Sequence, residues 1–205
     1  MLKLLLKLTL PAAFLLTTAV VFQKPALFAQ ESRMNNAQLD SSDGFGKVLV
    51  VYYSLSGNTK NIAMRIKEKT NADVYEIKTV EKYPPAPILY ITAKKQINPK
   101  NYPQLQDKMP DFEKYDLIFV GSPVWWYTAA APVLSFLSQA NFKGKTVVPF
   151  ATHGGNYGSF FEDFAKKAKN AVIINGKDFK KVKKEKEDSL NDKITVWLKS
   201  LAVEL

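Results

Sequence analysis

The chain of 205 residues contains no cysteine and a single histidine. Without cysteine it cannot form disulfides, use a thiol nucleophile or build a cysteine-ligated metal site. The lone His153 also excludes a histidine-rich metal centre. The folded domain must therefore depend on its hydrophobic core for stability.

Three common catalytic and nucleotide-binding signatures are also missing. No Gly-x-Gly-x-x-Gly run follows the first apolar strand, which disfavours a dinucleotide-binding fold. Gly144-Lys145-Thr146 resembles the end of a P-loop, but Gln139 occupies the position of the required leading glycine, and the triplet precedes a predicted strand. No Gly-x-Ser-x-Gly surrounds any serine, so a serine-hydrolase elbow is excluded.

The composition fits one basic α/β domain. Hydrophobic residues make up 46% of the chain and aromatic residues 12%, and the formal net charge is +10. A basic chain can favour an anionic partner, but the lysines are spread along the sequence. Their densest run, residues 177–186, is interrupted by Asp178 and Glu185. This pattern favours a solvated face, and we predict no nucleic-acid partner.

The first 29 residues have the features of an export signal. Lys3 and Lys7 precede an apolar stretch, residues 8–22, that is short for a membrane span, and residues 26–29 resemble a processing site. Leu27 occupies the −3 position of this processing site, where a smaller residue is preferred. We therefore predict an exported protein, periplasmic or extracellular. An uncleaved membrane anchor is the alternative, and the membrane would then be contacted only through this segment.

Beyond the signal, the chain divides into a polar linker at residues 30–45 and a domain at residues 46–205. Within the domain, short apolar runs alternate with segments of helical periodicity. The predicted strands are residues 47–53, 73–77, 115–120, 145–151 and 171–174. Helices are expected after Asn58, from Pro87 within a proline-rich stretch, from Pro132, from Ser159 with a capping box to Glu162, and from Ser189. The alternation predicts a three-layer α/β fold with a parallel sheet.

Three segments that leave the carboxyl ends of strands are candidates for a ligand site. The first is Ser54-Leu55-Ser56-Gly57-Asn58-Thr59. Its hydroxyls and the free N–H groups of a helix start can converge on one anion, and Gly57 allows close approach. No lysine or arginine lies inside the run, which suits a monophosphate better than a metal-bound triphosphate. A simple capped turn is the alternative.

The other two segments suit a flat ring. Residues 122–127 end in three consecutive aromatics, Trp125, Trp126 and Tyr127, which cannot all enter one core. At least one is expected to be exposed or to stack on a planar ligand, unless it fills an interface. Residues 152–159 contain three glycines, which allow main-chain groups to approach a ligand edge, or simply form a flexible loop. His153 suits either a ring contact or a structural role.

Together these motifs resemble the flavodoxin family, especially a short branch with a Pro-x-Trp-Trp second loop and a Gly-Gly third loop. The resemblance covers residue 47 to about residue 201 and implies a flavodoxin-like three-layer sandwich, with a five-stranded parallel sheet of order 2-1-3-4-5 and helices on both faces. It also implies flavin mononucleotide (FMN) as cofactor. The residues that it implicates in binding are Ser54, Ser56, Gly57, Asn58 and Thr59 at the phosphate, Pro123, Val124, Trp125 and Trp126 beside the ring, and Thr152, His153, Gly154 and Gly155 at its polar edge.

The leading functional hypothesis is an FMN-binding electron-transfer protein that exchanges electrons with redox partner proteins or small-molecule acceptors. The alternative is an NAD(P)H-dependent FMN or quinone oxidoreductase of the same fold, in which the proline-rich residues 79–111 form a pocket wall. A basic binding module that has lost flavin is a further alternative. The chain departs from the family pattern in its His153, where a small hydroxyl residue is more usual, its basic charge and its export signal.

Overall fold

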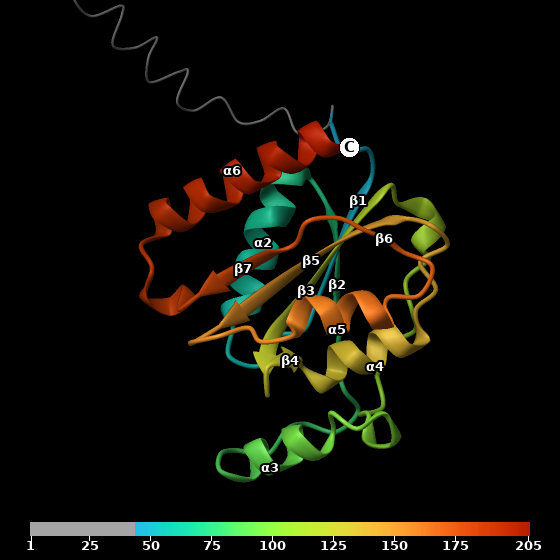
Figure 1. The fold of residues 1–205 in the computed structure, drawn as a ribbon, viewed down its shortest axis with the longest axis vertical. Helices are drawn as coiled ribbons and strands as arrows, with labels where there is room; N and C mark the ends of the chain where they lie inside the picture. The colour runs from blue at the N-terminus through green and yellow to red at the C-terminus, as the bar shows by residue number, and fades with distance from the viewer. Residues whose placement is uncertain (1–43) are drawn as a thin grey trace, which may run out of the picture. The chain divides into compact units, whose positions relative to one another are not determined.

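The structure is a computed structural model that describes residues 44–205 (Figure 1). The predicted export signal and nearly all of the predicted linker lie outside the described residues, so the domain boundaries stay predictions. Among residues 44–205, no helix is both long and apolar enough to cross a membrane.

A parallel sheet forms the centre of the domain. Its strands are β1 (Val48–Tyr52), β2 (Asp73–Glu76), β3 (Leu117–Trp125), β5 (Thr146–His153) and β6 (Val172–Ile173). They lie in the order β2-β1-β3-β5-β6, and every neighbouring pair is parallel. β5 and β6 are the fourth and fifth strands of this parallel sheet along the chain, so the predicted order 2-1-3-4-5 is confirmed. The helices that cover the sheet are α2 (Asn58–Thr70), α4 (Ala131–Gln139), α5 (Phe160–Lys167) and α6 (Glu187–Glu204).

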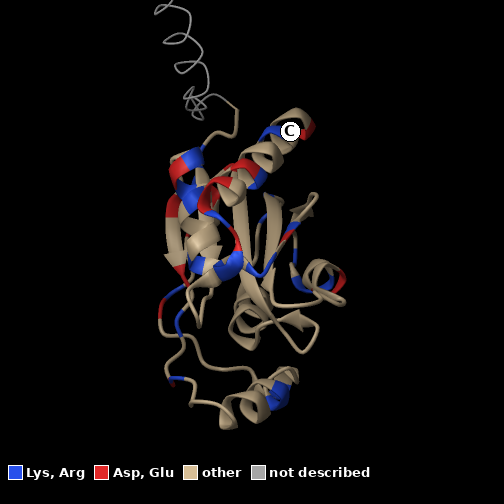
Figure 2. Cartoon of the chain, turned by 90° about the vertical axis from the view of Figure 1, so that its left-hand side faces the viewer, with Lys and Arg blue, Asp and Glu red and all other residues tan. Residues whose placement is uncertain are grey.

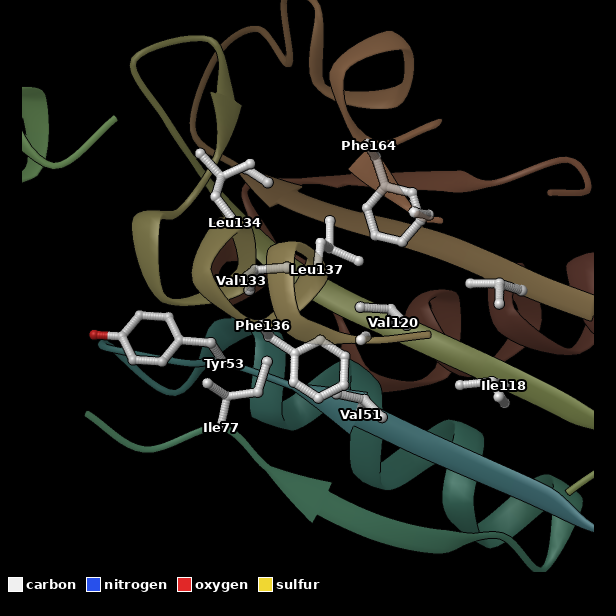
Figure 3. Close-up of a cluster of buried hydrophobic side chains, with 14 of the residues drawn as sticks. Val51, Tyr53, Ile77, Ile118, Val120, Val133, Leu134, Phe136, Leu137 and Phe164 are labelled. Atoms are coloured by element: carbon white, nitrogen blue, oxygen red, sulfur yellow. The ribbon is translucent and has the colours of Figure 1, made fainter. Parts of the chain in front are cut away.

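The alternation of side chains along the strands produces two hydrophobic cores, one on each face of the sheet. Leu49 and Val51 of β1 join a cluster with α4 and α5, whereas Val48, Val50 and Tyr52 join a cluster with α2 and α6. Figure 3 shows the first cluster, in which side chains of β1 and β3 meet those of α4 and α5. The predicted α/β three-layer sandwich is confirmed.

Two short strands were not predicted. β4 (Thr128–Ala129) pairs antiparallel with the end of β3, and β7 (Lys177–Lys180) pairs parallel with the carboxyl half of β5. The edge of the sheet is thus split into β6 and β7, and the break lies opposite Pro149 of β5. Proline has no N–H to donate, so an edge strand cannot continue its ladder past this residue.

The proline-rich stretch contains one α-helix, α3 (Ile88–Lys95), and two short 3₁₀ segments, Pro99–Asn101 and Phe112–Lys114. Pro87 directly precedes α3, as expected. Within α3 only Ala93 is buried, and Tyr90 is 60% exposed. α3 lies at the lower end of the view in Figure 1, away from the helices that cover the sheet.

Two predicted helix caps differ from the structure. Ser159 precedes α5, but its hydroxyl donates to the carboxylate of Asp163 at 2.7 Å instead of forming a capping box with Glu162. Ser189 lies inside the first turn of α6, which begins at Glu187, and it donates to Glu185 at 2.8 Å. In both cases a nearby carboxylate competes with the backbone for the serine hydroxyl.

Candidate functional site

The parallel register brings the three candidate segments to one edge of the sheet. Tyr52, at the end of β1, is level with Gly121 of β3, and Pro123 of β3 is level with Thr152 of β5. The chain leaves all three strands beyond these positions, as expected for a ligand site in an open α/β sheet. The sequence-predicted site residues therefore lie on neighbouring segments.

The first segment, residues 54–59, leads from β1 into α2. Gly57 immediately precedes the helix with a left-handed φ of 86°, and a Cβ at this position would meet no described atom within 4 Å. Within residues 44–205, no side chain caps the start of α2, and its first turn contains no acidic residue. The N–H groups of this turn therefore remain available to an anion.

The hydroxyls of this segment have different surroundings. Ser54 Oγ is buried and has no hydrogen-bond partner among the described residues. Ser56 Oγ accepts a hydrogen bond from Asn58 Nδ2 at 3.3 Å on the exposed surface. A buried hydroxyl without a partner is costly, so Ser54 needs a group that the rest of the fold does not supply.

Thr59 links the first segment to the third. Its Oγ1 lies 2.7 Å from Thr152 Oγ1, and the two residues are 1% and 3% exposed. Either hydroxyl can donate in this pair, and the sequence separation of 93 residues makes it a long-range contact. The bond holds the start of α2 against the end of β5.

The aromatic segment begins inside β3, which runs further than predicted and includes Pro123, Val124 and Trp125. The half-buried Trp125 ring meets Tyr53 edge-on at a centroid distance of 5.7 Å and Tyr83 at 5.0 Å. Burial raises the pKa of both Tyr53 and Tyr83 above the ordinary value for tyrosine. Three rings, from the residue directly after β1, from β3 and from the proline-rich stretch, thus form one aromatic wall.

Trp126 and Tyr127 form the turn between β3 and β4. Both have left-handed backbone conformations, with φ of 50° and 68°. Their side chains are 45% and 62% exposed, which bears out the expectation that consecutive aromatics cannot share one core. Trp126 Nε1 donates to the carbonyl of Tyr90 at 3.3 Å, so the turn contacts α3.

The third segment starts in β5, which includes Thr152 and His153. His153 Nε2 lies 2.9 Å from the Asp178 carboxylate of β7, while Nδ1 is buried without a partner among residues 44–205. Gly154 and Gly155 are exposed, and an added Cβ on either would meet no described atom within 4 Å. The backbone therefore has free space beside it at these two glycines.

The second and third segments are in direct contact. Gly158 has a φ of 58°, and a Cβ there would lie 2.4 Å from Tyr127 Cβ. Ser159 N donates to the Tyr127 carbonyl at 2.9 Å. Only glycine satisfies both the left-handed backbone and this close approach. The glycine at 158 therefore has a packing role, in contrast to Gly154 and Gly155.

Sequence reasoning missed three residues of this region: Tyr53, Tyr83 and Asp178. Tyr53 is the last residue of the predicted strand 47–53 and directly precedes the predicted anion loop. Tyr83 lies in the proline-rich stretch and Asp178 in the lysine-rich run, where no periodicity marked them. Among the described residues, no group of three or more potential ligands could hold a metal ion.

Comparison with known proteins identifies the family. A family model for flavodoxins matches residues 47–200. The chain belongs to the flavodoxin family. A search of curated proteins gave no match.

Solved structures agree with this membership. The crystal structure of a Lactobacillus acidophilus NCFM flavoprotein in complex with FMN is 30% identical, with a TM-score of 0.59, over 73% of this chain and 98% of that chain. An apo-form of the flavoprotein from the same organism, solved by NMR, is 32% identical, with a TM-score of 0.50, over 67% and 95%. A protein from Bacteroides eggerthii DSM 20697, assigned as a flavoprotein, is 28% identical, with a TM-score of 0.63, over 76% and 98%.

Proposed function

We propose that this flavodoxin-family protein binds FMN at residues 54–59, 123–127 and 152–155 and transfers electrons through it. The observation that carries the proposal is the uncapped start of α2 beside the buried, unpartnered hydroxyl of Ser54. Such an arrangement of neutral donors fits a phosphate monoester. The FMN complex of the Lactobacillus relative supports the same assignment.

The phosphate would be held by the first segment. Ser54 and Ser56 contribute hydroxyls, the first turn of α2 contributes N–H groups, and Gly57 leaves the approach open. The Thr59 hydroxyl is also bonded to Thr152, and it keeps its own O–H for the phosphate when Thr152 is the donor. This pair positions the helix start, and the Thr59 main-chain N–H is a further phosphate donor.

The ring would lie between the other two segments. Pro123, Val124, Trp125 and Trp126 offer one side, and Thr152, His153, Gly154 and Gly155 offer main-chain and side-chain groups to the polar edge. The contact between Tyr127 and Gly158 sets the spacing of these segments. When bound, FMN supplies the redox chemistry, while the protein binds it, orients it and sets its electrostatic surroundings.

Substitution of Gly57 by aspartate tests the proposal. In Gly57→Asp a carboxylate would oppose the phosphate, and we expect FMN affinity to fall at least about 100-fold, roughly 2.7 kcal/mol. Gly144→Asp is a matched control, because Gly144 has a similar φ of 80° and an equally open Cβ position in a different turn. Aspartate tolerates the left-handed conformation better than most residues.

The assay is FMN titration of the flavin-free protein, followed by flavin fluorescence and absorption. If Gly57→Asp and Gly144→Asp bind FMN equally well, the phosphate assignment is wrong. A wild-type protein that takes up no FMN would instead favour a binding module that has lost flavin.

A second candidate function is reduction of quinones or flavins by NAD(P)H. A pocket of about 460 Å³ lies in the proline-rich stretch, and Tyr83, which contacts Trp125, belongs to its lining. This places space for a small molecule next to the aromatic wall. Steady-state oxidation of NAD(P)H by the FMN-loaded protein, with quinone acceptors, distinguishes the candidates: turnover favours the reductase, and its absence favours the electron carrier.

We also propose that the protein is exported, on the basis of residues 1–29. The sequence has no twin-arginine pair near Lys7, so export before FMN binding is the expected order. Sequencing the N-terminus of the mature protein tests this. A chain that still begins at Met1 and fractionates with membranes would support the anchor instead.

A further inference from the structure

The lysine-rich run has a position that its sequence does not reveal. β7 pairs with β5 so that Lys180 is level with His153, and Lys181 N donates to the His153 carbonyl at 2.8 Å. The run therefore passes directly beside the third site segment. Val182 is buried in the core between the sheet and α6, which anchors the run at this place.

Five lysines of this run are exposed. We call Lys180, Lys181, Lys183, Lys184 and Lys186 the basic segment. None of them forms an ion pair with another described residue. In Figure 2 the connection between β7 and α6 faces the viewer, with lysine and arginine in blue.

The acidic residues that interrupt or follow the run do not neutralise the basic segment. Asp178 contacts His153, Glu185 contacts Lys193, and Glu187 contacts Arg65 at 3.4 Å. Asp188, in the first turn of α6, is the neighbouring acid without an ion-pair contact among residues 44–205. Five lysines therefore face solvent without an ion-pair partner among residues 44–205, in agreement with the predicted solvated face.

The basic segment spans the space between two of the site segments. At one end it is bonded to His153. At the other end it leads into Glu187, which lines one surface hollow together with Gly57 and Lys60 at the start of α2. Its positive charge is therefore placed along the rim of the proposed FMN site.

Exposed aromatic side chains adjoin the same rim. We call Tyr127 and Tyr157 the aromatic patch. The Tyr157 ring lies edge-on to His153 at 5.8 Å, and Tyr127 is joined to Ser159 by the main-chain bond described above. Apolar rings surrounded by charge are typical of protein interfaces.

We propose that the basic segment and the aromatic patch form a docking surface for a redox protein whose own cofactor is surrounded by acidic side chains. This rests on the proposed FMN site, since the docking surface matters for electron transfer only if flavin lies within its rim. Charge complementarity would accelerate encounter, and the aromatic patch would exclude water between the two cofactors. Electron-transfer complexes of this kind are small and short-lived.

The test uses the full-length, FMN-loaded protein and an acidic [2Fe–2S] ferredoxin as the probe. In stopped-flow mixing, each reduced ferredoxin cluster loses one electron to the oxidised flavin, and flavin absorbance reports the rate. We expect the second-order rate constant to fall at least about tenfold when the salt concentration rises from about 0.02 M to about 0.5 M. At low salt, the variant K180E/K183E/K184E should also be at least about tenfold slower than the wild type.

A matched control variant is K67E/K169E/K199E. It changes the net charge equally at exposed lysines of α2, the loop after α5, and α6, away from the basic segment. We expect its rate to stay within about threefold of the wild type. A basic cytochrome c as the electron acceptor should show the opposite preference, reacting faster with reduced K180E/K183E/K184E than with the reduced wild-type protein.

FMN content separates the two proposals. If the wild type binds no FMN, the proposed function itself fails. If all variants bind FMN and the ferredoxin rates are equal, the docking proposal is overturned while the FMN site stands. Equal ferredoxin rates combined with loss of binding to anionic phospholipid vesicles in K180E/K183E/K184E would assign the basic segment to a membrane surface and likewise overturn the proposal.

Discussion

The hydroxyl pair Thr59–Thr152 predicts a specific pattern of stability. Each residue is almost fully buried, so replacing one by valine keeps the shape and leaves the other hydroxyl without its partner. Such a loss costs about 1–3 kcal/mol, whereas removal of both partners is close to neutral. We therefore expect Thr59→Val and Thr152→Val each to lower the free energy of unfolding by about 1–3 kcal/mol, and the double variant to lose much less than their sum.

The assay is urea unfolding of the flavin-free protein, followed by tryptophan fluorescence. The folded apo-form of the Lactobacillus relative makes this a practical state to study. In thermal unfolding, each kcal/mol should correspond to a shift of about 2–4 °C in Tm. The two single variants and the double variant form a double-mutant cycle. Since Thr59 and Thr152 come from different layers, this cycle also measures the coupling free energy between α2 and β5.

Thr70 provides the control for this cycle. It is also buried, and its hydroxyl donates to the Ile66 carbonyl of its own helix at 2.8 Å. Thr70→Val should therefore combine additively with Thr152→Val. The reasoning is refuted if Thr59→Val and Thr152→Val are additive with each other, because the two hydroxyls would then not be coupled.

Three further predictions concern the core, pH and the flavin. Gly121→Ala places a Cβ 2.0 Å from the buried Phe150 ring, so we expect a loss of about 1–3 kcal/mol in urea unfolding, partly recovered in Gly121→Ala/Phe150→Leu. Burial, with Glu76 nearby, raises the pKa of Tyr52 to about 12, so the unfolded chain loses this proton first and stability should fall between about pH 10 and 12. Urea midpoints should fall less steeply over this range in Tyr52→Phe; an unchanged slope would argue against the assignment. Finally, spectroelectrochemical titration should give a less negative potential for full reduction of bound FMN than in acidic flavodoxins, because lysines near the site stabilise the anionic reduced flavin.

The main architecture could be predicted because strands covered on both faces are continuous apolar runs. β1 is buried at every position, and its continuous run of apolar residues is typical of a strand that is covered on both faces. The strand order came from the resemblance to flavodoxins, since alternation alone does not determine the order of parallel strands. The three site segments followed from the rule that ligands lie beyond the carboxyl ends of parallel strands.

The elements that were missed have few apolar residues and depend on a partner strand. β7 contains two lysines and an aspartate among its four residues, and it forms because the free half of β5 needs a neighbour. Its pairing places the solvent-exposed lysine-rich run beside residues 152–159, which the sequence alone does not indicate. The contacts of Thr59, Tyr83 and Asp178 likewise join residues far apart in the sequence, which periodicity cannot detect.

The split edge strand has a consequence for the behaviour of the protein in solution. β6 and β7 are two and four residues long, and at the opposite edge β2 has four residues and begins and ends with an acid. Neither border offers a long, uncharged row of unpaired main-chain groups on which another chain could add a strand. The interruption at Pro149 thus protects the folded domain against edge-to-edge aggregation at high concentration.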